Sequence, residues 1–368
     1  MRTLIFITLL FFSLKGSTQN NLTNGRQVYP SENHANLDSI QKRSQNVRIV
    51  FWNVENLYDP YDDSTKLDDE FTSGGMKRWT YSRFRQKLNH LAKSLLAIGR
   101  WEPPAAVGLC EVENRYVLNK LIYDSPLKPF KYKYIHHESP DLRGVDVALL
   151  YRPDKMKILA NRSISIRFPF DTLSQTREIL MVKGILFDQD TIHLLINHWP
   201  SRRGGTLASQ PRRNYVAGVL RQLVDSIQAH GSGQTVVIMG DFNDEPDSES
   251  ITGHLLARCD TSGMKTLDLV NLMFPKMKKE GTHKYQGQWA MLDQFMVTAN
   301  LFLGTQNLRA DYSMVHICRE AFLLQEDTRF FGDKPLRTYT GPKYTGGFSD
   351  HLPVYLDIRC KVQVTNDK

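Results

Sequence analysis

The stretch "VVIMGDFND" (residues 236–244) joins a short apolar run to a polar ending. The run 236–239 is typical of a buried strand, because it is rich in β-branched residues and stops at a glycine. A plain turn would explain much of 240–244. It explains less well why similar polar stretches recur in "GLCEVEN" (108–114) and "FSDHLP" (348–353). The pattern therefore indicates a fold in which rigid strands aim polar side chains at a site.

The rest of the chain from residue 47 has an α/β pattern. Helical spacing predicts helices at 84–99, 115–123 and around 216–227. Apolar runs predict strands at 47–56, 105–113, 132–139, 144–152, 157–166, 179–187, 191–199, 235–239, 290–298 and 353–360. Because most of these strands are consecutive, the order argues against a Rossmann or barrel alternation. It favours two packed, mainly antiparallel sheets with helices outside.

The composition is that of a globular protein that can bind anions. The 368 residues are 41% hydrophobic and 23% charged, and the formal net charge is +8. This excess fits a polyanionic substrate such as nucleic acid, a phospholipid headgroup or a phosphorylated metabolite. A basic protein without such a partner fits the charge equally well, and no motif indicates an oligomer, so we expect a monomer.

The N-terminus predicts export. Residues 1–19 combine a positive start, an apolar run and small residues, as in a signal peptide, so a secreted or periplasmic protein is expected. The apolar run is shorter than the roughly 20 residues of a membrane span, so we expect no stable membrane insertion, although an uncleaved anchor is the alternative. Residues 20–46 are expected to form a polar linker, and residues 47–362 are expected to form one domain.

Four cysteines have no zinc-like spacing: Cys110, Cys259, Cys318 and Cys360. Export would allow some of them to pair, whereas Cys110 lies in a buried-looking strand and is expected to be a free packed thiol.

Polar side chains follow the predicted strands repeatedly. They are Asn53, Glu55, Glu111, Glu113, Asn114, Asn197, His198, Asp241, Asn243, Asp293, Ser349, Asp350 and His351. Each alone has an ordinary structural explanation, such as a helix cap, a turn or a packed histidine. Together they form a set of acids, amides and histidines without a thiolate cluster. Such oxygen-rich sets suit Mg²⁺, Mn²⁺ or Ca²⁺ better than structural zinc.

Five of these segments resemble the ordered motifs of the endonuclease/exonuclease/phosphatase superfamily, the metal-dependent phosphoesterases related to deoxyribonuclease I. They are "WNVEN" (52–56), "LCEVEN" (109–114), "NHWPSR" (197–202), "GDFND" (240–244) and "SDHLP" (349–353). The combination of "GDFN" with a later "SDH" is specific, and the spelling "NHWPSR…GG" further resembles a secreted bacterial branch. The resemblance implies a four-layer α/β sandwich and spans almost the whole domain.

The resemblance also implies a metal site. Glu111 would bind the essential Mg²⁺ with Asn53 beside it. Glu55 falls where the family often has a second acid, so it would tune this metal or hold another. Asp350 would ligate metal or support the final histidine.

The same resemblance implies the catalytic groups. Asp241 would align or deprotonate the attacking water, and Asn243 would hydrogen-bond the scissile phosphate. His198 and His351 would contact phosphate oxygens, one of them as acid or base. Asp293 would orient His351, although "LDQF" departs from relatives in which His or Tyr follows the acid. Whether Asp241 or His351 takes the proton stays open.

Basic and amide residues near the motifs are candidates for substrate binding. Arg202 and Arg203 would form an anion clamp beside His198, or a solvated turn. Arg143 would reach a phosphate or stay on the surface, and Asn114 is a further candidate. The segment 310–347 has no clear periodicity and is expected to be an ordered loop near the site. Its residues Arg337, Tyr339, Lys343 and Tyr344 would line a groove for single-stranded nucleic acid or pack the loop against the body.

Three functions fit the sequence. The first is a secreted Mg²⁺-dependent phosphodiesterase, specifically a nuclease that cuts internally. The second is a phosphatase or phospholipase on the same fold, acting on sphingomyelin-like or inositol phosphate groups. The third is a catalytically dead binding module, which has no physical need of the acids, amides and histidines.

Overall fold

A computed structural model of the protein describes residues 45–100, 102–186, 190–231 and 233–360. The predicted signal peptide and nearly all of the predicted linker lie outside these residues. Within the part of the chain that is described, no helix is long and apolar enough to cross a membrane.

The first large sheet has the strand order β14-β20-β1-β2-β4-β3, with β15 also paired to β20. Its strands are β1 (Gln45–Leu57), β2 (Ala106–Val112), β3 (Lys133–His136), β4 (Asp146–Tyr151), β14 (Leu308–Arg309), β15 (Val315–Ile317) and β20 (Val354–Cys360). β1 and β2 run parallel, and the other neighbours are antiparallel.

The second large sheet has the order β5-β6-β7-β8-β13-β10-β9. Its strands are β5 (Met156–Ile164), β6 (Ile179–Leu186), β7 (Asp190–His198), β8 (Thr235–Asp241), β9 (Ala257–Arg258), β10 (Leu269–Asn271) and β13 (Asp293–Thr298). β7 and β8 run parallel, as do the short β9 and β10, and the remaining pairs are antiparallel.

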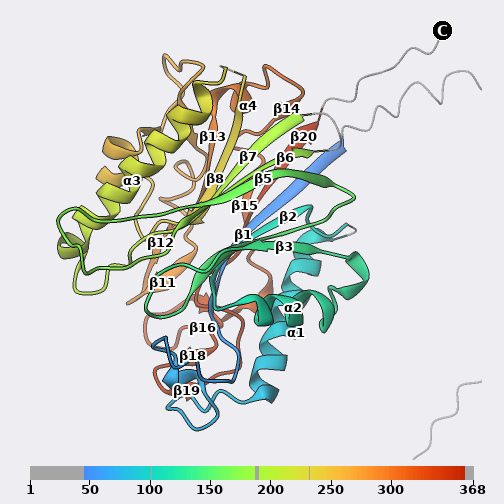
Figure 1. The fold of residues 1–368 in the computed structure, drawn as a ribbon, viewed down its shortest axis with the longest axis vertical. Helices are drawn as coiled ribbons and strands as arrows, with labels where there is room; N and C mark the ends of the chain where they lie inside the picture. Colours follow the sequence, from blue (N-terminus) through green and yellow to red (C-terminus); the bar gives the residue numbers. More distant parts are fainter. Residues whose placement is uncertain (1–44, 101, 187–189, 232, 361–368) are drawn as a thin grey trace, which may run out of the picture. The chain divides into compact units, whose positions relative to one another are not determined.

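Alternation along β1 shows how the layers are built. Ile49 and Phe51 belong to the apolar core between the two sheets, whereas Val50 and Trp52 pack with residues of α1 (Tyr81–Gly99) and α2 (Arg115–Tyr123). On the second sheet, the apolar face of α3 (Thr206–Gln228) packs against β7 and β8. Figure 1 shows α3 on one side of the sheets and α1 with α2 on the other. The predicted four-layer sandwich is confirmed.

Two predicted segments differ from the structure. The strand expected over 290–298 is divided into β12 (Gln288–Ala290) and β13, because Met291 and Leu292 break the run and only β13 pairs with β8. The segment 310–347 contains β15, a 3₁₀ turn at Ala321–Leu323 and two hairpins. These hairpins are β16 (Leu324–Glu326) with β17 (Asp333–Pro335), and β18 (Tyr339–Thr340) with β19 (Lys343–Tyr344).

The remaining elements are short. They are β11 (His283–Tyr285), which pairs with β12, α4 (Ala299–Leu303), the 3₁₀ turns Asp69–Phe71 and Lys128–Phe130, and the π-helical turn Ser250–His254. All four cysteines are free thiols, and Cys110 is buried as expected.

Candidate active site

The two parallel strand pairs bring the predicted site residues to one edge of the sandwich. Asn53 of β1 pairs in register with Cys110 of β2, directly before Glu111. In the second sheet, His198 of β7 pairs with Asp241 of β8, which in turn pairs with Asp293 of β13. Since parallel strands end at the same edge, side chains far apart in sequence become neighbours there.

Asp241 is the centre of this cluster. Its Oδ2 accepts a hydrogen bond of 3.0 Å from Asn53 Nδ2 and lies 3.8 Å from His198 Nε2 and 3.9 Å from His351 Nε2. Its Oδ1 accepts from the backbone N of Asn243 at 2.9 Å. Burial raises the pKa of Asp241 to about 7, against the opposing charge of His351. Four predicted residues thus meet at one carboxylate.

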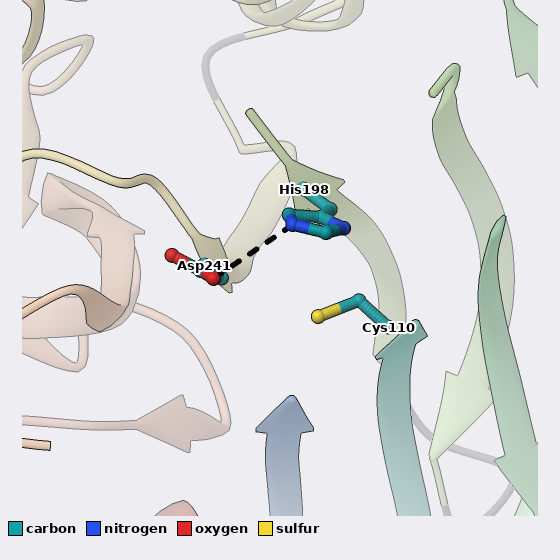
Figure 2. A group of neighbouring side chains, drawn as sticks. All are labelled: Cys110, His198 and Asp241. Atoms are coloured by element: carbon teal, nitrogen blue, oxygen red, sulfur yellow. Dashed lines mark ion pairs between the residues drawn. The ribbon is translucent and has the colours of Figure 1, made fainter. Parts of the chain in front are cut away.

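The Cys110 thiol lies in the same neighbourhood. Figure 2 shows Asp241 and His198 facing each other, with Cys110 nearby on β2 of the first sheet. Burial raises the pKa of the Cys110 thiol well above its ordinary value, so the sulfur stays protonated. A protonated thiol is a poor metal ligand, which agrees with the packed thiol expected from the sequence.

His351 is held from three sides. Its Nδ1 lies 2.7 Å from Asp293 Oδ2, so the ring orientation is fixed with Nε2 towards Asp241. Its carbonyl accepts from the indole of Trp52 at 2.9 Å, and its backbone N donates to Ser349 Oγ. Burial alone lowers the pKa of His351, but the nearby carboxylates of Asp293 and Asp241 outweigh it and hold the pKa well above its usual range.

Glu111 lies at a bulge where the register of β2 against β4 shifts. Its backbone is left-handed, with φ of 60°, and its Oε2 accepts from the backbone N of Asn56 at 2.8 Å. Its Oε1 is 3.9 Å from His198 Nε2, and Arg143 Nη2 lies 3.7 Å from Oε2. Left-handed non-glycine residues also occur at Glu55, Asn56 and Asn243. Such strained backbone concentrates at functional sites.

His198 is neutral in this environment. Its pKa is lowered well below the ordinary value, first by burial and then by the cations Arg177 and Arg143. Arg177 was not predicted from the sequence. Its Nη2 donates to the carbonyl of Trp199 at 2.7 Å and its Nη1 to Asp141 at 3.1 Å, so it supports the end of β7. A basic residue just before a predicted strand carries no sequence signal for such a role.

Glu55 and Asp350, both predicted as metal ligands, lie on either side of Arg337. Arg337 Nε donates to Glu55 Oε1 at 3.2 Å, and its Nη2 donates to Asp350 Oδ2 at 2.9 Å. The other oxygen of Glu55 accepts from the backbone N of Thr338 at 2.6 Å. Arg337 therefore links the two acids in one ion-pair cluster.

The predicted substrate-binding residues lie in different places. Arg143 contacts Glu111 and donates to Asn56 Oδ1 at 2.6 Å, and Arg202 Nε donates to the carbonyl of Asn243 at 2.6 Å. Arg203 is exposed. Asn114 caps α2 by accepting from Val117 N, and donates to Asp59, so both ends of its amide are engaged away from Asp241.

The loop aromatics Tyr339 and Tyr344 pack against the body, which is the second of the two placements expected from the sequence. Tyr339 is 5% exposed and contacts the rings of Trp79 and Phe71. Tyr344 lies under the guanidinium of Arg83. A different histidine, His283, approaches the site: its ring centroid is 4.7 Å from that of His351, and the two residues form a β-bridge.

Asp244, the second acid of "GDFND", stabilises the fold through its contacts with Arg213 and Ser250. Its Oδ2 lies 2.7 Å from Nε of the fully buried Arg213 and accepts from Ser250 Oγ at 2.6 Å. We expect Asp244→Ala to lower the free energy of unfolding by about 3 kcal/mol, since it leaves a buried charge unpaired. Urea unfolding of the purified variant measures this. The exposed Asp247→Ala is the matched control, and equal stability of both variants would contradict the role.

The carboxylate and amide oxygens at this edge of the sandwich suit the coordination of a hard divalent cation. Glu111 Oε1 accepts no hydrogen bond from the described residues, and Asn53 Oδ1 accepts only one, from the backbone N of Glu55. Asp241 and Asp293 add carboxylate oxygens, and both carboxylates lie within 4 Å of His351. Carboxylate and amide oxygens in this number suit Mg²⁺, Mn²⁺ or Ca²⁺.

Comparison with solved structures shows the same fold. A Bacteroides thetaiotaomicron protein of the endonuclease/exonuclease/phosphatase family is 12% identical, with a TM-score of 0.54 over 87% of this chain and 100% of its own. Humanized D. rerio TDP2 is 15% identical, with a TM-score of 0.53 over 85% and 98%. A B. thetaiotaomicron mannosyl-6-phosphatase is 14% identical, with a TM-score of 0.52 over 85% and 99%.

No curated protein sequence matches the chain significantly. The sequence model described as "Endonuclease/Exonuclease/phosphatase family", however, matches residues 48–360. That match covers most of the chain and includes both sheets with all the strand-end residues around Asp241. The chain therefore belongs to the endonuclease/exonuclease/phosphatase family.

Proposed function

We propose that this protein is a secreted, Mg²⁺-dependent phosphodiesterase, specifically an endonuclease. One observation supports this above all: Asp241 Oδ2 lies within 4 Å of Asn53, His198 and His351. Phosphodiester hydrolysis needs a positioned water, charge neutralisation and a stabilised leaving oxygen. This cluster offers a group for each task, on rigid strand ends.

Glu111, with Asn53 beside it, would hold the divalent cation. When bound, Mg²⁺, or Mn²⁺ or Ca²⁺ in its place, would neutralise charge on the phosphate and on the leaving oxygen. We expect Glu111→Gln to weaken metal binding by about 10-fold or more, since it removes the charged ligand. Isothermal titration with Mn²⁺ measures this, and an unchanged titration would move the ligand role to another residue.

The side chains around the cation site would divide the remaining work. Asp241 would orient the attacking water and accept its proton. His351 lies between two carboxylates, which favours its protonated form, so it would bind a phosphate oxygen and not take the proton. The neutral His198 would donate a second hydrogen bond, and Asn243 would contact the scissile phosphate.

A groove beside Asp350 supports a polymeric substrate. Its walls include Lys284, Tyr285, Arg329, Phe330 and Lys334. Tyr285 is 67% exposed and available for stacking. Lys284 and Lys334 are both paired with Asp327, so the exposed Arg329 and the aromatic rings are the groups available to the phosphates and bases of single-stranded nucleic acid. The net charge of +8 acts in the same direction.

The second candidate is a phosphatase or phospholipase, because the mannosyl-6-phosphatase shares the fold. A panel of duplex DNA, single-stranded DNA, RNA, sphingomyelin, inositol phosphates and a sugar 6-phosphate, each with Mg²⁺ and with EDTA, separates the candidates. We expect EDTA-sensitive internal cleavage of nucleic acid. Hydrolysis of a monoester or lipid alone would favour the second candidate, and no hydrolysis of any substrate would favour a binding module.

We further propose export through the segment 1–19, as in a secreted bacterial branch of the family, and a monomeric state. N-terminal sequencing of the protein from its native host tests cleavage near residues 17–19. Light scattering of the purified protein tests the oligomeric state.

A further inference from the structure

We propose that the guanidinium of Arg337 takes the place of a metal ion between Glu55 and Asp350, two acids that the sequence predicts as metal ligands, so that the site binds a single divalent cation. The inference deepens the proposed function, since it concerns the same site and rests on that assignment.

The contacts place a fixed positive charge between two acids. Arg337 donates to Glu55 at 3.2 Å through Nε and to Asp350 at 2.9 Å through Nη2. Both distances are those of charge-assisted hydrogen bonds. A second metal ion that uses these carboxylates would have to displace a group that is always charged and fits them with two donors.

The segment that carries Arg337 is locked in place. Thr338 N donates to Glu55 at 2.6 Å, and Thr345 Oγ1 donates to the carbonyl of Arg337. Gly347 lies against this backbone so closely that a Cβ there would be 2.3 Å from the Arg337 carbonyl oxygen. The guanidinium is therefore part of the folded site and not a surface side chain that swings in.

A second cation reinforces the assignment. Lys87 of α1 is 1% exposed, and its Nζ donates to Thr338 Oγ1 at 2.6 Å and to the carbonyl of Phe348. Lys87 and Arg337 together supply two positive charges next to the two acids Glu55 and Asp350. The charge of this half of the site is thus already balanced by protein groups, whereas Glu111 Oε1 accepts no hydrogen bond from the residues that the structure describes.

The test counts bound metal without any substrate. Isothermal titration with Mn²⁺ alone is applied to the full chain and to Arg337→Met, which keeps length and removes charge. We expect one ion per chain in the parent protein, two in Arg337→Met, and one in the matched control Arg329→Met, an exposed arginine of the nearby groove. The double variant Arg337→Met/Glu55→Gln should again bind one ion, because it lacks one of the two carboxylates that would hold the second.

Two results would overturn the proposal. One is a parent protein that binds two ions, of which Glu55→Gln removes one. The other is a folded Arg337→Met that still binds one. If circular dichroism shows that Arg337→Met does not fold, the parent protein and Glu55→Gln, both expected to bind one ion, decide the question. Because no substrate is present, a wrong substrate assignment leaves this result intact.

Discussion

Asp241→Asn is expected to lower kcat on a phosphodiester by about 10³-fold, the middle of the range for loss of a general base. The amide keeps the size of the side chain and an oxygen for Asn53, whose hydrogen bond to Asp241 is 3.0 Å long. It cannot accept a proton from water, and it removes the charge that faces His198 and His351. Initial rates on bis(p-nitrophenyl) phosphate at saturating Mg²⁺ measure the effect.

The matched control for Asp241→Asn is Asp247→Asn, an exposed acid of the following turn. It should keep the parent rate, and thermal unfolding should show that both variants fold. A folded Asp241→Asn with nearly normal turnover would remove Asp241 from the chemistry and leave His351 as the candidate base.

His351→Gln is expected to lower kcat by about 10²-fold to 10³-fold, because it removes a charged donor near the reacting phosphate. Asp293→Asn should lower it less, since the imidazole remains but loses the partner that is 2.7 Å from its Nδ1. The double variant should be no slower than His351→Gln, since an orienting residue has no role once the ring is absent. The same phosphodiester assay measures all three.

The exposed His254→Gln is the control for the histidine series. Additive losses in the double variant would show that Asp293 acts independently of His351. The pH dependence of kcat gives a second measurement, because a residue that only stabilises the fold would leave its shape unchanged.

Much of the fold was predictable because its strands carry strong local patterns. Runs such as 236–239 are apolar on both sides, as expected for strands that face a helix on one side and a second sheet on the other. The strand at 290–298 was predicted as continuous because Met291 and Leu292 are apolar, although the chain leaves the β11–β12 hairpin there before β13 begins in the second sheet. Apolar character alone does not distinguish a buried irregular link between two strands from a continuous strand.

The site was predictable only in part, for a physical reason. Asp241, His198 and Glu111 each lie at the end of a strand that is recognisable in the sequence, so a search for polar residues at strand ends finds them. Arg337 lies 282 residues from Glu55, and no local pattern fixes that contact. Tyr339 has the composition of a stacking residue, yet it packs on Trp79 because the β18–β19 hairpin folds back onto α1 and its neighbours.

The position of β20 has a consequence for synthesis. This last strand lies inside the first sheet, between β14 and β1, and the turn before it carries His351. A ribosome must therefore synthesise the chain as far as β20 before His351 can join Asp241 in the folded site. For the exported nuclease that we propose, this order would be protective, since chains truncated before β20 would be harmless to the nucleic acids of the cell that makes them.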